Sequence, residues 1–209
     1  SMLKSVVSNG KIYAAGGANN GPLGTFESYD PATNQWTTLA SMPTPLEPGG
    51  IAALDGKIYV LGGVGGGTHS KVQVFDVATG QWSAGVDLPI ATMESTTVAI
   101  DGKILFFGGQ TGSAPTFNTA KTYEFTPGSD AWVEKASMNH ARYGIASCVH
   151  DGKAYAIGGY SSETGRSDKV EYYDPAANTW TEITSLANAR HHPATFSLGG
   201  KLYVVGGSG

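Results

Sequence analysis

Short apolar runs separated by glycine-rich turns recur along the whole chain, and this pattern predicts short strands. Five of these runs end in a pair of glycines, and the pairs recur every 46 to 50 residues. They are Gly16-Gly17, Gly62-Gly63, Gly108-Gly109, Gly158-Gly159 and Gly206-Gly207. Apolar runs this short, bounded by turn residues, favour strands over helices. A fixed period of this length is typical of repeat folds, so the pattern predicts an array of similar β units.

Two-residue turns stand between the first two predicted strands of every unit. They are Asn9-Gly10, Asp55-Gly56, Asp101-Gly102, Asp151-Gly152 and Gly199-Gly200. Such pairs tolerate positive φ at both central positions, as a tight hairpin turn between antiparallel strands requires. Each unit is therefore expected to begin with a hairpin.

The strands of one unit differ in their polarity. The first strand is rich in small residues, as in 50–54 and 95–100, and the second is apolar without alternation, as in 57–61. A strand that is apolar on both sides is expected to be covered on both faces. The third strand alternates, as in 72–75 and 170–173, which predicts one face that is wetter than the other.

The third strand ends at an aspartate in three units, at Asp30, Asp76 and Asp174. An aspartate there is expected to accept hydrogen bonds from the backbone N–H groups just downstream. The fourth strand begins at a tryptophan, and these tryptophans keep the period of the glycine pairs. Their large apolar area is best explained by packing within or between units. They are Trp36, Trp82, Trp132 and Trp180.

Four antiparallel strands per unit, with a glycine pair and a late tryptophan, resemble the kelch family over essentially the whole chain. Tyr29-Asp30, Phe75-Asp76 and Tyr173-Asp174 belong to the same pattern. The resemblance implies an all-β fold of kelch-type β-propeller blades, each with four antiparallel strands and the first strand innermost. It predicts a single propeller domain or a fragment of one, with four complete blades plus a half blade. The expected boundaries are 3–45, 46–91, 92–141, 142–190 and 191–209.

The predicted half blade leaves a strand edge at Lys201–Val205. Unpaired backbone groups along such an edge are a template for another strand. The blade is therefore expected to be open or completed by another chain, and self-association is the expectation. The other interpretation is a fragment of a longer propeller with six or seven blades.

Composition excludes several classes of partner and site. The formal net charge is −4, and the 13 lysines and arginines are scattered, so a nucleic-acid surface is not expected. No apolar stretch reaches the length of a membrane-spanning helix. The one cysteine excludes a disulfide framework and a cysteine-based zinc site.

The resemblance implies a non-catalytic binding module for a protein or peptide, without a cofactor. In such domains, the residues after each glycine pair and in the links between blades commonly contact the ligand. The candidates at the matching positions are Asn19, Asn20, Glu47, Met93, Glu94, Gln110, Arg142, Tyr143, Tyr160, Arg190, His191 and His192.

Two of these candidates, Arg142 and Arg190, carry a positive charge. Guanidinium groups suit bidentate pairing with carboxylates, so an acidic peptide is the ligand they would favour. The alternative is that both arginines pair with carboxylates or backbone groups of the neighbouring blade.

The adjacent His191 and His192 raise the question of a metal site. Neighbouring side chains on extended chain point in opposite directions, and no carboxylate stands at a recognised ligand spacing. No metal site is therefore expected.

A second class of function stays open, because kelch propellers also occur in enzymes that act on sugars, such as sialic acid isomerases. Such an enzyme would need a pocket of arginine, glutamate and histidine. The residues of these types are Glu47, Glu94, Arg142, Arg190 and His191. The binding module is the favoured reading.

Overall fold

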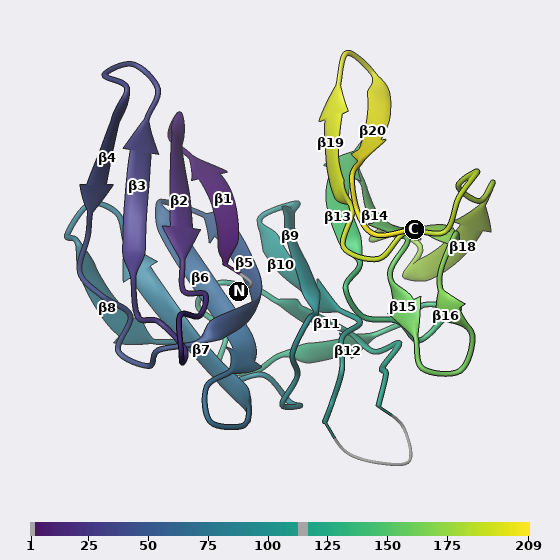
Figure 1. Cartoon of the computed structure of the whole chain (residues 1–209), viewed down its shortest axis with the longest axis horizontal. Helices are drawn as coiled ribbons and strands as arrows, with labels where there is room; N and C mark the ends of the chain where they lie inside the picture. The colour runs from purple at the N-terminus through teal and green to yellow at the C-terminus, as the bar shows by residue number, and fades with distance from the viewer. Residues whose placement is uncertain (1–2, 113–116) are drawn as a thin grey trace. The chain divides into compact units, whose positions relative to one another are not determined.

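The computed structural model describes residues 3–112 and 117–209, and these residues form strands and turns without any helix. The chain divides into two compact units, Ser1–Met93 and Glu94–Gly209. We describe each unit by itself (Figure 1). Since the described residues contain no helix, none of them forms a helix that could cross a membrane.

The first unit contains two antiparallel sheets, each with four strands in chain order. The first sheet is made of β1 (Lys4–Ser8), β2 (Lys11–Ala15), β3 (Phe26–Asp30) and β4 (Gln35–Thr38). The second is made of β5 (Glu47–Leu54), β6 (Lys57–Val64), β7 (Thr68–Asp76) and β8 (Gln81–Ala84). These are the first two predicted blades.

The second unit contains two further four-stranded sheets and two hairpins. The third blade comprises β9 (Thr96–Ile100), β10 (Lys103–Phe107), β11 (Thr122–Phe125) and β12 (Val133–Lys135). The fourth comprises β13 (Ala146–His150), β14 (Lys153–Ile157), β17 (Val170–Asp174) and β18 (Thr179–Ile183). The hairpins are β15 (Tyr160–Ser161) with β16 (Gly165–Arg166), and β19 (Ala194–Leu198) with β20 (Lys201–Val205). The predicted four blades and half blade are therefore confirmed.

The hairpin turns have the backbone that the sequence predicts. Both residues of all five turns have positive φ, for example 50° at Asp55 and 70° at Gly56. The aspartates after the third strands also act as expected, since Asp76 Oδ1 accepts hydrogen bonds from the backbone of Ala78 and Thr79. Chiefly for this reason, the pKa of Asp76 is lowered.

The first strand of each blade is the innermost one. In the first unit β1 contacts β5, and in the second unit β13 contacts both β9 and β19. Small residues suit this crowded position. Apolar side chains of neighbouring sheets form the core of each unit, around Phe26 and Phe75 in the first and around Phe107 and Tyr173 in the second.

Two tryptophans join neighbouring blades, as predicted. Trp82 Nε1 donates a hydrogen bond to the carbonyl of Ala40 at 2.7 Å, and Trp180 Nε1 donates to that of Ala136 at 3.0 Å. Each acceptor lies just after the fourth strand of the preceding blade. Trp36, in the first blade, is 55% exposed.

The expectation of a wetter face on the third strand is wrong for β7. Val72, Gln73, Val74 and Phe75 are all buried. The polar member is satisfied inside the protein, because the Gln73 amide donates to the carbonyl of Thr44 and accepts from its N–H. The polar residue in the alternating pattern of β7 is therefore Gln73, which binds the link that leads into this blade.

Candidate functional site

All candidate residues lie at one end of the blades, which we call the loop end. In a four-stranded antiparallel blade, the loop after the second strand and the link after the fourth are at the same end. Among the described residues, the loops are 18–25, 65–67, 110–112 with 117–121, and 160–169, which contains β15 and β16. The links are 39–46, 85–95, 136–145 and 184–193.

The glycine pairs fix each link to the blade before it. The second glycine donates its N–H to a link carbonyl, as in Gly17 to Leu46 at 3.1 Å and Gly159 to Arg190 at 2.7 Å. The first glycine lies against the same carbonyl, and a Cβ on Gly16 would be 2.2 Å from the Leu46 oxygen. The periodic glycines therefore allow each blade to pack closely against the link that leads to the next blade.

Arg142 does not face a ligand, because it is only 1% exposed. Its Nη1 donates to the carbonyls of Gly158 and Lys169, and its Nη2 pairs with the Glu171 carboxylate at 2.7 Å. Burial lowers the pKa of Arg142, and the charge of Glu171 opposes that shift. The expectation that Arg142 binds an acidic peptide is therefore wrong. The alternative holds, since Arg142 in the link pairs with a carboxylate and backbone carbonyls of the neighbouring fourth blade.

Arg190 has a similar role, although it is only partly buried. Its Nη1 donates to the carbonyl of Gly206, the first glycine of the next pair, at 2.6 Å. Arg142 makes the equivalent contact with Gly158. Each arginine thus fixes its link to the first glycine of the blade that the link leads into, Arg142 to Gly158 and Arg190 to Gly206.

The remaining candidates fall into both units. Asn19 and Asn20 are exposed in the first unit, whereas Glu47 and Met93 are partly buried there. Gln110 lies in the second unit, where it forms an isolated bridge with Asn118.

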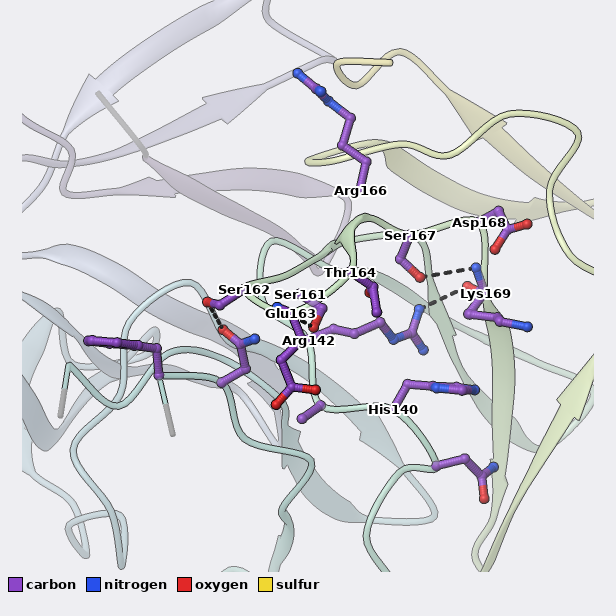
Figure 2. A pocket seen from close by; sticks show the side chains of 14 residues that line it. His140, Arg142, Ser161, Ser162, Glu163, Thr164, Arg166, Ser167, Asp168 and Lys169 are labelled. Atoms are coloured by element: carbon purple, nitrogen blue, oxygen red, sulfur yellow. Dashed lines mark hydrogen bonds between the residues drawn. The ribbon is translucent and has the colours of Figure 1, made fainter. Parts of the chain in front are cut away.

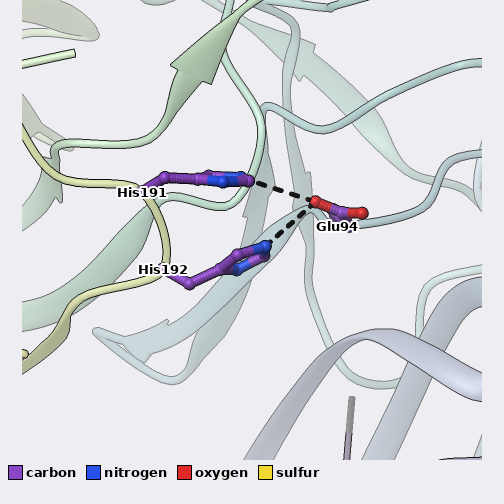
Figure 3. A group of neighbouring side chains, drawn as sticks. All are labelled: Glu94, His191 and His192. Carbon is purple, nitrogen blue, oxygen red and sulfur yellow. Dashed lines mark ion pairs between the residues drawn. The ribbon is translucent and has the colours of Figure 1, made fainter. Parts of the chain in front are cut away.

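Five of the candidates come together in the second unit: Glu94, Tyr143, Tyr160, His191 and His192. The His191 ring lies edge-on to Tyr143, with centroids 5.3 Å apart, and 5.4 Å from that of Tyr160. It also lies 3.9 Å from the ring of His192. The Glu94 carboxylate faces both imidazoles, at 3.7 Å from His191 Nε2 and 3.2 Å from His192 Nε2 (Figure 3). We call the glutamate and the two histidines the Glu94 cluster.

The expectation that the two histidines point in opposite directions is wrong. That expectation assumed extended chain, but His192 has a φ of 53°. A left-handed residue turns the chain, and here it brings both rings to the same side. Histidine is one of the few residues that adopt this conformation with some frequency.

Gly144 makes room for the Glu94 cluster. Glu94, Gly144 and His192 occupy equivalent positions in three successive links, and their φ values are 52°, 59° and 53°. Gly144 donates its N–H to the Glu94 carbonyl at 2.9 Å and accepts from the N–H of His192 at 3.0 Å. A Cβ on Gly144 would lie 2.3 Å from His191 Nε2. Aligning the links in the sequence would have shown this glycine between two polar residues.

The electrostatics of this region favour a neutral imidazole at His191. Burial lowers its pKa, His192 lowers it further, and Glu94 acts in the other direction. Burial also raises the pKa of the Tyr143 hydroxyl, with a further contribution from Glu94.

A polar pocket of about 560 Å³ opens in the second unit, between the β15–β16 loop and the link before β13 (Figure 2). Of the predicted ligand residues, only Arg142 is in its wall, where it is buried. The walls are otherwise mostly polar or charged. The lining residues are Phe117, Asn118, Asn139, His140, Ala141, Arg142, Ser161, Ser162, Glu163, Thr164, Arg166, Ser167, Asp168 and Lys169. The polar run 161–169 after the fourth glycine pair was the sequence signal for it.

Hydrogen bonds and ion pairs shape the walls of the pocket. Ser162 Oγ donates to Asn118 Oδ1 at 3.0 Å, which connects the loops of two blades. Lys169 Nζ pairs with Glu182 at 2.6 Å, and His140 Nε2 lies 2.9 Å from the same side chain. Hydrogen bonds from Lys169 and then His140 lower the pKa of Glu182 to about 2.

Comparison with known proteins covers nearly the whole chain. Residues 49–209 match the KLHDC2/KLHL20/DRC7 Kelch-repeats domain, and residues 1–43 match the Kelch motif. A solved structure entitled "Structure of YjhT" is similar, with a TM-score of 0.84 and 18% sequence identity. That alignment covers 99% of this chain and 76% of the other. At this identity the similarity shows the fold alone.

Proposed function

Because the chain belongs to the kelch-repeat family, we propose that it is a non-catalytic binding module that holds a protein or peptide at its loop end. The observation that carries this proposal is the pocket beside the β15–β16 loop. Its volume of about 560 Å³ is in the range typical of ligand pockets.

The walls of the pocket are held in place before any ligand arrives. The buried Arg142 and Glu171 pair fixes the link on one side, since Glu171 also accepts hydrogen bonds from the backbone and side chain of Asn139. A wall fixed in this way loses little conformational entropy on binding, which favours affinity.

The chemistry of the pocket fits a polar peptide. With Arg142 paired to Glu171 and Lys169 to Glu182, the exposed Arg166 is the cation best placed to attract an acidic residue. Figure 2 shows its side chain directed away from His140 and Lys169. We therefore propose that an acidic side chain of the peptide binds at the rim, and that serine and threonine hydroxyls contact its backbone.

A displayed peptide library selected against the purified chain tests this function, followed by fluorescence-polarisation titration of an enriched peptide. Thr164→Trp would fill the pocket and should weaken binding at least about tenfold, because the lost contacts are those of the site centre. Ala176→Trp is the matched control, since Ala176 is exposed in the turn at the opposite end of the same blade. Equal affinity of the two variants, or no enriched peptide, would refute the proposal.

One observation favours a second function, catalysis on a sugar. Glu94 and His191 form a carboxylate and imidazole pair beside the rings of Tyr143 and Tyr160. Such a pair can exchange protons with a sugar hydroxyl, and flat rings can pack against a sugar face. Incubation with N-acetylneuraminic acid, followed by NMR of its anomers, would detect turnover. Turnover that Glu94→Gln abolishes would replace the binding proposal.

We also propose that the half blade pairs with a second copy of the chain. Among the described residues, no strand pairs with the outer edge of β20. Leu198 and Val205 in this hairpin are 64% and 48% exposed. Light scattering should detect a dimer that Val205→Lys weakens, because an edge lysine opposes strand addition. A monomeric wild-type chain at high concentration would refute this.

A further inference from the structure

The Glu94 cluster has the composition and spacing of a metal site. It offers one carboxylate oxygen and two imidazole nitrogens, and these three atoms all lie within 4.8 Å of one another. The carboxylate oxygen is 3.7 Å from His191 Nε2 and 3.2 Å from His192 Nε2. Figure 3 shows both rings directed at the same oxygen.

These spacings are those of ligands that share one ion. Zinc binds histidine nitrogen and carboxylate oxygen at about 2.0–2.2 Å, so the edge of its tetrahedron is roughly 3.3 Å. The two distances to Glu94 lie on either side of that value. Each histidine nitrogen thus lies within a few tenths of an ångström of this spacing from Glu94, and the third pair, His191 and His192, lies within 4.8 Å.

The backbone holds the three side chains in this arrangement. Gly144 is hydrogen-bonded to both Glu94 and His192, and its missing side chain leaves the space that His191 Nε2 approaches. Preorganised ligands lose less freedom on binding, which favours affinity for an ion.

The state of His191 also suits a ligand. Its Nε2 is buried and has no hydrogen-bond partner among the described residues. An imidazole nitrogen without a hydrogen-bond partner can offer its lone pair to a metal ion.

We propose that Glu94, His191 and His192 bind a divalent transition metal ion, with Zn²⁺ the best match. Two histidines and one glutamate form a ligand set that zinc uses where a fourth position stays open to water or a bound molecule. The His192 side chain is 41% exposed, so this position can be reached from solvent. An ion there would connect the link into the third blade with the link into the half blade, across Gly144.

The test is a calorimetric titration of the chelator-treated full chain with Zn²⁺ alone. We expect one ion per chain and a higher melting temperature, since binding to the folded state stabilises it. Co²⁺ in place of Zn²⁺ should give visible absorption typical of four ligands. Glu94→Gln, His191→Ala and His192→Ala should each weaken Zn²⁺ binding at least about tenfold.

His69→Ala is the matched control, because this histidine lies in β7 of the second blade, where its Nε2 is 3.0 Å from the Gly65 carbonyl, and it is not part of the Glu94 cluster. It should bind Zn²⁺ like the wild type. Circular dichroism checks that each variant is folded. The absence of saturable binding below about 100 µM, or equal binding by the three cluster variants, would overturn the metal site. Peptide titrations with chelator present keep this result separate from the pocket proposal.

Discussion

The link into the second blade and the link into the fourth blade are held to their blades by different types of side chain. In the first unit Leu46 is buried, and the neutral Gln73 side chain holds the backbone of Thr44. In the second unit the equivalent positions carry Arg142 and Glu171, which form a buried ion pair. The same fold thus accepts either an apolar and neutral pair or a charged pair.

This comparison indicates that the residue in the link and its partner on the third strand have to match each other. A leucine needs only apolar surroundings, and glutamine satisfies the link with neutral hydrogen bonds. An arginine at the same place requires a carboxylate, because a buried charge without a partner is costly. The charged version also places the Arg142 side chain in the wall of the pocket, whereas the first unit has the apolar Leu46 at the equivalent position.

Breaking the ion pair should have the largest effect. Glu171→Gln leaves the Arg142 charge buried without its counterion and should lower the free energy of unfolding by about 3–5 kcal/mol. The double variant Arg142→Leu with Glu171→Gln recreates the pair of the first unit and should recover most of that loss. Urea denaturation measures both. A double variant as unstable as the single one would show that the two solutions are not interchangeable.

Gly16 and Gly206 have nearly the same backbone conformation but differ in how closely other atoms surround them. Gly16 and Gly206 have φ values of 68° and 66°, but a Cβ on Gly16 would meet the Leu46 oxygen, while one on Gly206 meets nothing within 4 Å. Gly206→Ala should cost about 1–2 kcal/mol from backbone strain alone. Gly16→Ala should cost about 1–3 kcal/mol more, from the clash. Thermal unfolding of both variants checks the order, and equal costs would mean that the packing at Gly16 can relax.

The tryptophans offer a smaller contrast. Trp180 is 9% exposed and donates to Ala136 and Thr122, whereas Trp36 is 55% exposed. Trp180→Phe loses both hydrogen bonds and should lower the free energy of unfolding by about 1–3 kcal/mol. Trp36→Phe should change it by less than about 0.5 kcal/mol. Chemical denaturation measures both variants. Equal losses of unfolding free energy would contradict the role of Trp180 in holding neighbouring blades together.

The smallest expected effect concerns pH at the rim of the pocket. The folded-state pKa of Glu182 is about 2, against 4.5 for an ordinary glutamate. A lowered pKa stabilises the folded state above about pH 4.5, and this stabilisation is lost as the pH falls toward 2. Glu182→Gln should therefore show a slightly shallower loss of melting temperature between pH 5 and pH 2. His69→Ala has no part in this ion pair and serves as the control; an unchanged slope for Glu182→Gln would contradict the shift.

The regular features of the fold could be read from the sequence because they depend on local backbone. The turn pairs predict positive φ wherever they occur, and the glycine pairs and tryptophans mark each blade. The candidate site could be predicted only in part. The sequence predicts that Tyr143, Tyr160, His191 and Glu94 lie at the loop end. It does not predict that they contact one another beside Gly144.

The sequence by itself determined the blade, its four strands and the end at which the loops gather, since each follows from patterns a few residues long. Only the tertiary structure decided which polar side chains face solvent. Arg142 is enclosed by Glu171 and two carbonyls from residues far along the chain, and the left-handed turn at His192 brings two imidazoles to Glu94. Burial and partnership of a charge depend on residues that are distant in sequence, so local pattern cannot fix them.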